Sequence, residues 1–279
     1  MLANLFARSM TGIIYVILIC VGILWNSFSF FIVFSIAVMV CLWEFYHLIN
    51  AQKRTKINPY YNCLGGFLLF LITFLYASGV FDYHIFFVYL IYIVGILISE
   101  LYEKHQDPIT HSAYIFLGQT YIAIPFALLN LIAFRGFLGG VPFYNTLLIL
   151  SLFVFLWIND TGAYLVGITV GKHKLFERIS PQKSWEGFFG GLVFTVASAF
   201  VFAHFETSIP IYHWIGLSLS IVVFGTWGDL IESLIKRTLG VKDSGYSLPG
   251  HGGYLDRFDS FLLAVYGMLF YVQLFIIRN

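Results

Sequence analysis

The residues of this sequence that could do chemistry are acids and cations in a polar stretch between two apolar segments. Asp229 lies inside the first apolar segment, and Asp256 and Asp259 lie where the second one begins, after a glycine-containing turn. Charges inside long apolar segments are energetically costly and are therefore candidates for function. Acids beside cations and a glycine turn suit a divalent metal ion and phosphate groups. The alternative for Asp256 and Asp259 is helix capping, because the helix dipole stabilises acids at an N-terminus.

A helix around Asp229 would present a row of polar side chains on one face. Asp229, Glu232, Ser233 and Lys236 are spaced three or four residues apart, which aligns them on a helix. An internal ion pair between Glu232 and Lys236 is the alternative to a functional role for that acid. The turn that follows could bend sharply and offer backbone N–H groups to a phosphate. It consists of Gly250, His251, Gly252 and Gly253.

A second polar passage lies upstream and carries an acid and several cations. Asp160 lies inside an apolar segment, where we expect a buried acid that needs a partner. Ser180 and Glu186 predict the start of a helix, with Glu186 in its first turn. The cations of this passage form a cluster suited to a triphosphate: Lys172, Arg178 and Lys183. The positive-inside rule would explain these cations equally well, without any role in binding.

The composition places these residues in a membrane protein. The chain has 279 residues, of which 59% are hydrophobic and 10% are charged, whereas soluble domains carry about 25% charged residues. The net charge of +1 gives no indication of nucleic-acid binding. The long apolar runs lack the alternation of membrane strands, so we expect an all-α polytopic bundle and not a β-barrel.

Hydropathy predicts about nine transmembrane helices. One side of the membrane would then hold all Lys and Arg residues except Arg135 and Arg278, and the positive-inside rule makes that side the cytoplasm. Pro125 predicts a kink in the fifth span. We expect a single membrane domain with residues 1–150 as scaffold and residues 151–279 as catalytic part. The predicted spans are residues 9–26, 28–49, 64–80, 84–101, 112–134, 143–167, 187–205, 211–235 and 254–277.

The polar stretch resembles a known family signature. Residues 233–259 read S-x-I-K-R-x4-K-D-x-G-x2-L-P-x-H-G-G-x2-D-R-x-D, which is similar to the signature of phosphatidate cytidylyltransferases, also called CDP-diacylglycerol synthases. Tyr254 departs from it, because an aliphatic residue is usual there. The upstream passage also resembles the family, with an Asp-Thr-x-Ala-Tyr element at residues 160–164 and a Ser-Pro-x-Lys-x-Trp-Glu-Gly element at residues 180–187.

The resemblance implies transfer of a cytidylyl group from CTP to phosphatidate, giving CDP-diacylglycerol and pyrophosphate. It implies Mg²⁺ held by Asp229 and Asp256, and room for a second cation near Asp259. The implied partners are CTP, phosphatidate and the lipid bilayer, without nucleic acid, and a homodimer is compatible with them. The short loops and the distribution of Lys and Arg predict a bacterial inner membrane with a cytoplasmic active site. The implied catalytic residues are Asp229, Asp256, Lys236 and Arg237. The implied substrate-binding residues are Asp160, Lys172, Ser180, Lys183, Glu186, Lys242, Asp243, His251, Gly252, Gly253 and Arg257.

Two other functions stay open at the level of the sequence. A related membrane enzyme could use a different lipid, as a polyprenol kinase or as a cytidylyltransferase for another lipid phosphate. A secondary transporter could use charges inside its spans as ion sites, but these would be expected in both halves of the chain. Here the polar residues gather in the second half. The sequence lacks the D-x2-D-G-x2-A-R arrangement of CDP-alcohol phosphotransferases.

Overall fold

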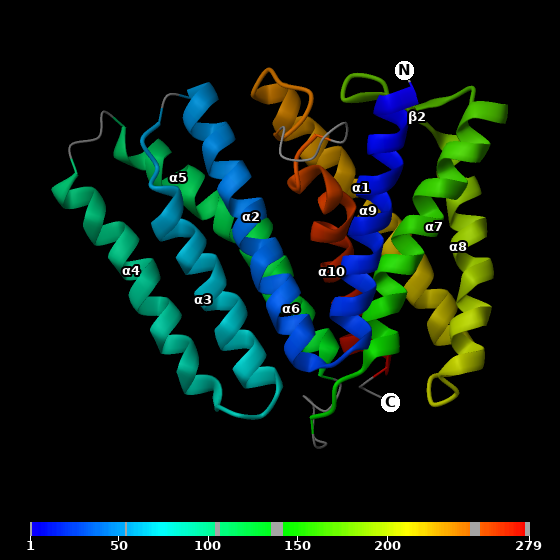
Figure 1. Ribbon diagram of the computed structural model, residues 1–279, viewed down its shortest axis with the longest axis horizontal. Helices are drawn as coiled ribbons and strands as arrows, with labels where there is room; N and C mark the ends of the chain where they lie inside the picture. The colour runs from blue at the N-terminus through cyan, green and yellow to red at the C-terminus, as the bar shows by residue number, and fades with distance from the viewer. Residues whose placement is uncertain (1, 54, 104–106, 135–141, 246–251, 277–279) are drawn as a thin grey trace. The chain divides into compact units, whose positions relative to one another are not determined.

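The computed structural model describes residues 2–53, 55–103, 107–134, 142–245 and 252–276, and most of them are helical (Figure 1). The principal helices are α1 (Leu2–Leu24), α2 (Ser27–Lys53), α3 (Pro59–Ala77), α4 (Phe86–Tyr102), α5 (Pro108–Gly118), α6 (Ile124–Ala133), α7 (Thr146–Val170), α8 (Trp185–Phe205), α9 (Ile211–Thr238) and α10 (Asp259–Tyr271). Shorter helical turns are η1 (Tyr83–Ile85), η2 (Gln119–Ala123), η4 (Leu255–Arg257) and η5 (Val272–Ile276). Two strands complete the described elements, β1 (Lys174–Phe176) and β2 (Ser180–Ser184).

The prediction of an all-α membrane bundle is confirmed. Within the described residues, eight helical segments are long and apolar enough to cross a membrane. The first expected span is represented by a shorter apolar helix, Met10–Leu24. Because lipid cannot hydrogen-bond backbone groups, a helix is the conformation that satisfies each of these segments internally.

The chain divides into two compact units. The first contains Met1–Tyr144 and Leu239–Arg257, and the second contains Asn145–Thr238 and Phe258–Asn279. The family-like signature therefore contributes residues to both units. The division into a scaffold of residues 1–150 and a catalytic part of residues 151–279 stays a prediction about function.

In the first unit, α2 packs against α1 and α3, and α3 packs against α4 and α6 (Figure 1). The fifth predicted span is one continuous segment, Pro108–Ala133, made of α5, η2 and α6. Pro125 lies in the first turn of α6, directly after the π-helical turn η2. Since proline cannot donate a helix hydrogen bond, the π turn is the local irregularity that accommodates it.

In the second unit, α7 packs against α8, and α9 packs against α10 (Figure 1). Glycines allow these helices to approach closely. A Cβ atom added at Gly191 would lie 2.5 Å from Oδ1 of Asn159, and one added at Gly228 would lie 2.6 Å from the carbonyl oxygen of Asp259. Small residues at such contacts are typical of packed membrane helices.

A β-hairpin connects α7 to α8, and no pattern in the sequence predicted it. Strands β1 and β2 are antiparallel, with Lys174 opposite Ser184 and Phe176 opposite Ser180. The expected helix start at Ser180 is wrong, because Ser180 begins β2. The helix begins at Trp185, and the Ser184 hydroxyl accepts the Gly187 N–H as its cap (3.1 Å). Glu186 does lie in the first helical turn, as predicted.

Candidate active site

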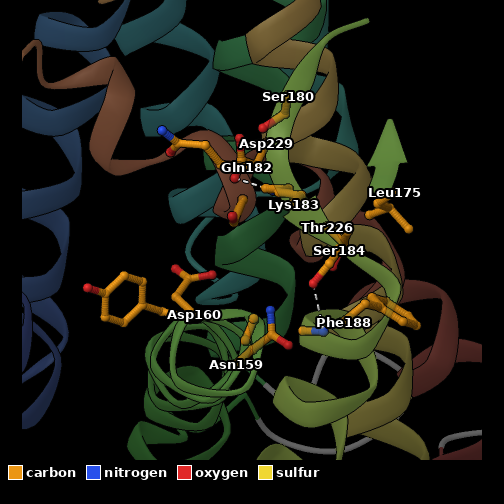
Figure 2. A pocket seen from close by; sticks show the side chains of 15 residues that line it. Asn159, Asp160, Leu175, Ser180, Gln182, Lys183, Ser184, Phe188, Thr226 and Asp229 are labelled. Carbon is orange, nitrogen blue, oxygen red and sulfur yellow. Dashed lines mark hydrogen bonds and ion pairs between the residues drawn. The ribbon is translucent and has the colours of Figure 1, made fainter. Parts of the chain in front are cut away.

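A cavity of about 360 Å³, lined by several polar side chains among apolar ones, lies in the second unit. It is formed by side chains and backbone from α7, the β-hairpin, α8, α9 and α10 (Figure 2). Its size is in the range of small-molecule sites, which are concave and carry a few well-placed polar groups. The lining residues are Asn159, Asp160, Ala163, Tyr164, Gly167, Leu175, Ser180, Gln182, Lys183, Ser184, Gly187, Phe188, Thr226, Asp229 and Ser260.

An ion pair joins two of the predicted site residues at this cavity. Lys183 on β2 contacts Oδ2 of Asp229 on α9 (Figure 2). The Ser233 hydroxyl donates to the other carboxylate oxygen of Asp229 (3.3 Å). The two charged side chains remain 28% and 25% exposed, so the pair contributes little to stability. Both charges are therefore accessible to a ligand in the cavity.

The α7 helix contributes a neighbouring acid and amide to the cavity. Asp160 lines the cavity (Figure 2), and the expectation that it is buried is wrong, because it is exposed. Burial was expected because Asp160 follows an apolar run, but this part of α7 lies beside the cavity. Asn159 is buried, and its Oδ1 has no hydrogen-bond partner among the described residues. This amide oxygen was not predicted as part of the site.

The acid that begins α10 belongs to the same group of charges. Asp259 lies within electrostatic range of Asp229, Glu232 and Asp160. No group of three His, Cys, Asp or Glu side chains among the described residues converges closely enough to form a complete metal site by itself. Mg²⁺ commonly takes one or two carboxylates and completes its shell with water and phosphate oxygens. One or two of these carboxylates would therefore be enough to hold a magnesium ion that binds together with a phosphate substrate.

Farther along α9, the simpler alternative for Glu232 is confirmed. Nζ of Lys236 lies 2.9 Å from Oε2 of Glu232, four residues earlier, and Glu232 is buried. Arg237 is exposed in the last turn of α9. The predicted catalytic roles of Lys236 and Arg237 stay predictions, and that of Lys236 requires this ion pair to be shared or opened.

The first unit holds the glycine loop, defined here as residues 239–245 and 252–257. Oδ2 of Asp256 accepts three hydrogen bonds in it, from the backbone N–H of Ser244 (3.0 Å), the Ser244 hydroxyl (3.0 Å) and the Gly253 N–H (2.8 Å). Gly252 has a φ of +79°, a conformation that glycine adopts without strain. The Gly253 N–H, a predicted phosphate donor, is thus directed to Asp256.

The last helix begins later than predicted, after the residues that these bonds hold. Asp256 lies in the 3-10 turn η4, and α10 begins at Asp259. The two acids are therefore not successive members of one helical face. Asp256 belongs to the first unit, whereas Asp229 and Asp259 belong to the second, so a magnesium ion shared by Asp229 and Asp256 stays a proposal.

The remaining predicted residues of the glycine loop differ in exposure. Lys242 and Asp243 are exposed, and Arg257 is partly buried. His251 lies outside the described residues. Their predicted contacts with substrate stay predictions.

In the second unit, Glu186 fastens the β-hairpin to α8. Its carboxylate accepts the backbone N–H groups of Lys172 (3.1 Å) and His173 (3.2 Å) and contacts the His173 ring (2.6 Å). The contacts place Glu186 as an anchor of the hairpin that carries Lys183. The upstream cations Lys172 and Arg178 are exposed.

Replacing Glu186 with alanine is expected to loosen the hairpin. All three contacts would be lost, so trypsin should cleave after Lys172 and Lys174 severalfold faster in detergent-solubilised protein. Glu186→Gln should show a smaller effect, because glutamine keeps one acceptor oxygen. The Glu177→Ala variant, changed at an exposed acid of the same hairpin, should be cleaved by trypsin at the wild-type rate. Equal cleavage of the Glu186→Ala and Glu177→Ala variants would contradict the anchoring role.

Together, the fold and the site define a polytopic helical membrane protein with a cavity in which an acid and a cation meet. A family model described as the cytidylyltransferase family matches residues 6–275. The chain belongs to this family, which confirms the resemblance seen in the sequence.

Several curated relatives are named phosphatidate cytidylyltransferase. The protein from Staphylococcus aureus (strain COL) is 45% identical over 140 residues, which cover 48% of this chain and 54% of the relative. The protein from Haemophilus influenzae is 45% identical over 129 residues, covering 44% of this chain and 45% of the relative. The chain therefore spans about half the length of the curated relatives it matches.

Proposed function

We propose that this protein transfers a cytidylyl group from CTP to phosphatidate, producing CDP-diacylglycerol and pyrophosphate. The family and the names of the relatives support this reaction. The observation that carries the proposal is the ion pair of Lys183 and Asp229 at a cavity of a membrane protein. A cation and an acid at one place are what a phosphate and its metal ion require.

The reaction needs charge neutralisation more than it needs a base. A phosphatidate oxygen attacks the α-phosphorus of CTP, the new P–O bond forms, and the bond to pyrophosphate breaks. The attacking phosphate is already anionic, so no proton has to be removed from it. The main obstacle is repulsion between two polyanions, and catalysis by positioning and electrostatics suits such a step.

The chain's own groups can meet this requirement. Lys183 would donate to a phosphate of CTP when its ammonium group is shared between the nucleotide and Asp229. Mg²⁺ would be held by Asp229 and Asp256, with Asp259 near a second cation. When bound, the metal ion supplies positive charge to the α-phosphate and the departing pyrophosphate. Asn159 and Gln182 would orient the nucleotide through their amide groups.

The protein is an integral membrane protein, and the finer location is part of the proposal. A bacterial inner membrane with the active site on the cytoplasmic side would bring CTP from the cytoplasm and the lipid from the bilayer. The predicted distribution of Lys and Arg supports this orientation. A homodimer is compatible with the proposal, and we expect no nucleic-acid partner.

The proposal is tested by incorporation of labelled CTP into lipid by the purified protein in detergent. We expect label in the lipid phase and released pyrophosphate only when both phosphatidate and Mg²⁺ are present. If label enters the lipid phase with another lipid phosphate but not with phosphatidate, the proposed mechanism stands and the proposed substrate is wrong. No turnover with any lipid, by protein shown to be folded, would overturn the proposal.

A further inference from the structure

An acid in the first unit, far from the signature in sequence, contacts the glycine loop. Glu44 lies in α2, a helix long and apolar enough to span a membrane, and is only 5% exposed. A carboxyl group in such a place is costly and calls for a specific role. Its Oε2 accepts the backbone N–H of Leu255 (2.9 Å), a residue 211 positions later in the chain.

The loop is shaped to receive this carboxyl group. A Cβ atom at Gly253 would lie 2.4 Å from Oε2 of Glu44, and one at Gly245 would lie 3.2 Å from Oε1. A side chain at Gly253 would also lie 2.2 Å from the Ser244 hydroxyl. Glycine at this position therefore allows the loop backbone to lie directly against Glu44.

The residues immediately before and after Asp256 are both held by hydrogen bonds to side chains of other helices. Glu44 on α2 binds the N–H of Leu255, the preceding residue. The Tyr15 hydroxyl on α1 donates to the carbonyl oxygen of Arg257, the following residue (3.1 Å). Within the loop, Asp256 itself ties Ser244 to Gly253. These contacts fix the backbone from which the Asp256 carboxylate projects.

We propose that Glu44 is a positioning residue for the transfer reaction: it anchors the glycine loop to α2 and thereby sets the place of Asp256. The inference rests on the proposed function, in which Asp256 is a metal ligand. Glu44 acts through the loop backbone and does not touch the substrate. Groups that orient metal ligands typically change metal affinity or activity by about 10–100-fold when they are removed.

Two substitutions separate the hydrogen-bond acceptor of Glu44 from its negative charge. Glu44→Leu removes the acceptor and suits a membrane helix, whereas Glu44→Gln keeps an acceptor oxygen of nearly the same reach. Glu100→Leu is the matched control, because Glu100 is another acid of the first unit within a span and contacts His111 on α5. Tyr15→Phe removes the second anchor with a minimal change of shape.

The first measurement does not depend on activity. Amide hydrogen exchange of the purified, folded proteins is followed in peptides covering residues 252–257. We expect exchange about 10-fold faster or more in Glu44→Leu, near wild type in Glu44→Gln and Glu100→Leu, and intermediate in Tyr15→Phe. Unchanged exchange in Glu44→Leu would overturn the anchor. If Glu44→Leu does not fold, Glu44→Met removes the acceptor with a more flexible side chain, and unchanged exchange in that variant would likewise overturn the anchor.

The second measurement tests the link to the reaction. The Mg²⁺ concentration for half-maximal rate should rise about 10-fold or more in Glu44→Leu, and glutamine should restore it. The KM for phosphatidate should change less than kcat. If the loop exchanges faster but the Mg²⁺ requirement stays at the wild-type value, Glu44 is structural only and the proposal fails. Absence of activity in the wild type would instead refute the proposed function, and the exchange experiment would still decide whether the anchor exists.

Discussion

Asp229→Asn should lower kcat by about 100-fold or more and leave the thermal unfolding temperature almost unchanged. A bound metal ion contributes several kcal/mol of transition-state charge stabilisation, and each 1.36 kcal/mol corresponds to a factor of about 10 in rate. Asparagine has nearly the same shape and can still accept from Ser233. The partly exposed pair with Lys183 contributes little stability. Initial rates with labelled CTP and thermal unfolding in detergent measure the two effects.

The Asp229 prediction has a matched control and a clear contrary result. Glu177→Gln, at an exposed acid of the β-hairpin, should keep the wild-type rate. Lys183→Met should also lose activity, and the double variant should lose less than the two single effects combined, because the two side chains are in contact. A near-normal rate and Mg²⁺ dependence in Asp229→Asn would refute the assignment of Asp229 as a metal ligand.

The helical fold could be predicted because the bilayer leaves the chain few choices. Apolar segments of membrane length must satisfy their backbone groups internally, so hydropathy predicted the order of the spans. It counted nine, whereas eight segments of the described residues are long enough and the first expected span is the shorter helix Met10–Leu24. The β-hairpin was missed because its strands, Lys174–Phe176 and Ser180–Ser184, are too short and polar to show an alternating pattern. Glu186 also ties the beginning of the hairpin to α8, and this contact joins residues that sequence spacing does not bring together.

The site was predictable where its contacts are local. The ion pair of Glu232 and Lys236 follows from their spacing of four residues on a helix. The contact of Lys183 with Asp229 joins a strand to a helix, so the sequence could nominate both residues but could not pair them. Glu44 was missed entirely, because its partner Leu255 is distant in the chain. Its sequence signal was that of an acid inside an apolar segment.

Asp256→Ala should differ from Asp229→Asn by losing both activity and stability. The Asp256 carboxylate accepts three hydrogen bonds that close the glycine loop, and hydrogen bonds to charged groups contribute about 1.5–3 kcal/mol. We expect the free energy of unfolding to fall by about 2–3 kcal/mol and kcat to fall by about 100-fold or more. Thermal unfolding and initial rates, measured on the same preparation, check the two losses. Asp82→Ala, at an exposed acid of the first unit whose side chain makes no capping bond, is the control for stability.

Asp256→Asn separates the two roles of this residue. The asparagine side-chain oxygen can still accept from Ser244 and Gly253, so most of the lost stability should return. The negative charge does not return, so the rate should stay low if Asp256 binds the metal ion. Recovery of the rate together with stability would mean that Asp256 acts only by closing the loop. Since Glu44 is proposed to act through Asp256, that result would also leave any effect of Glu44→Leu on the Mg²⁺ requirement without a cause.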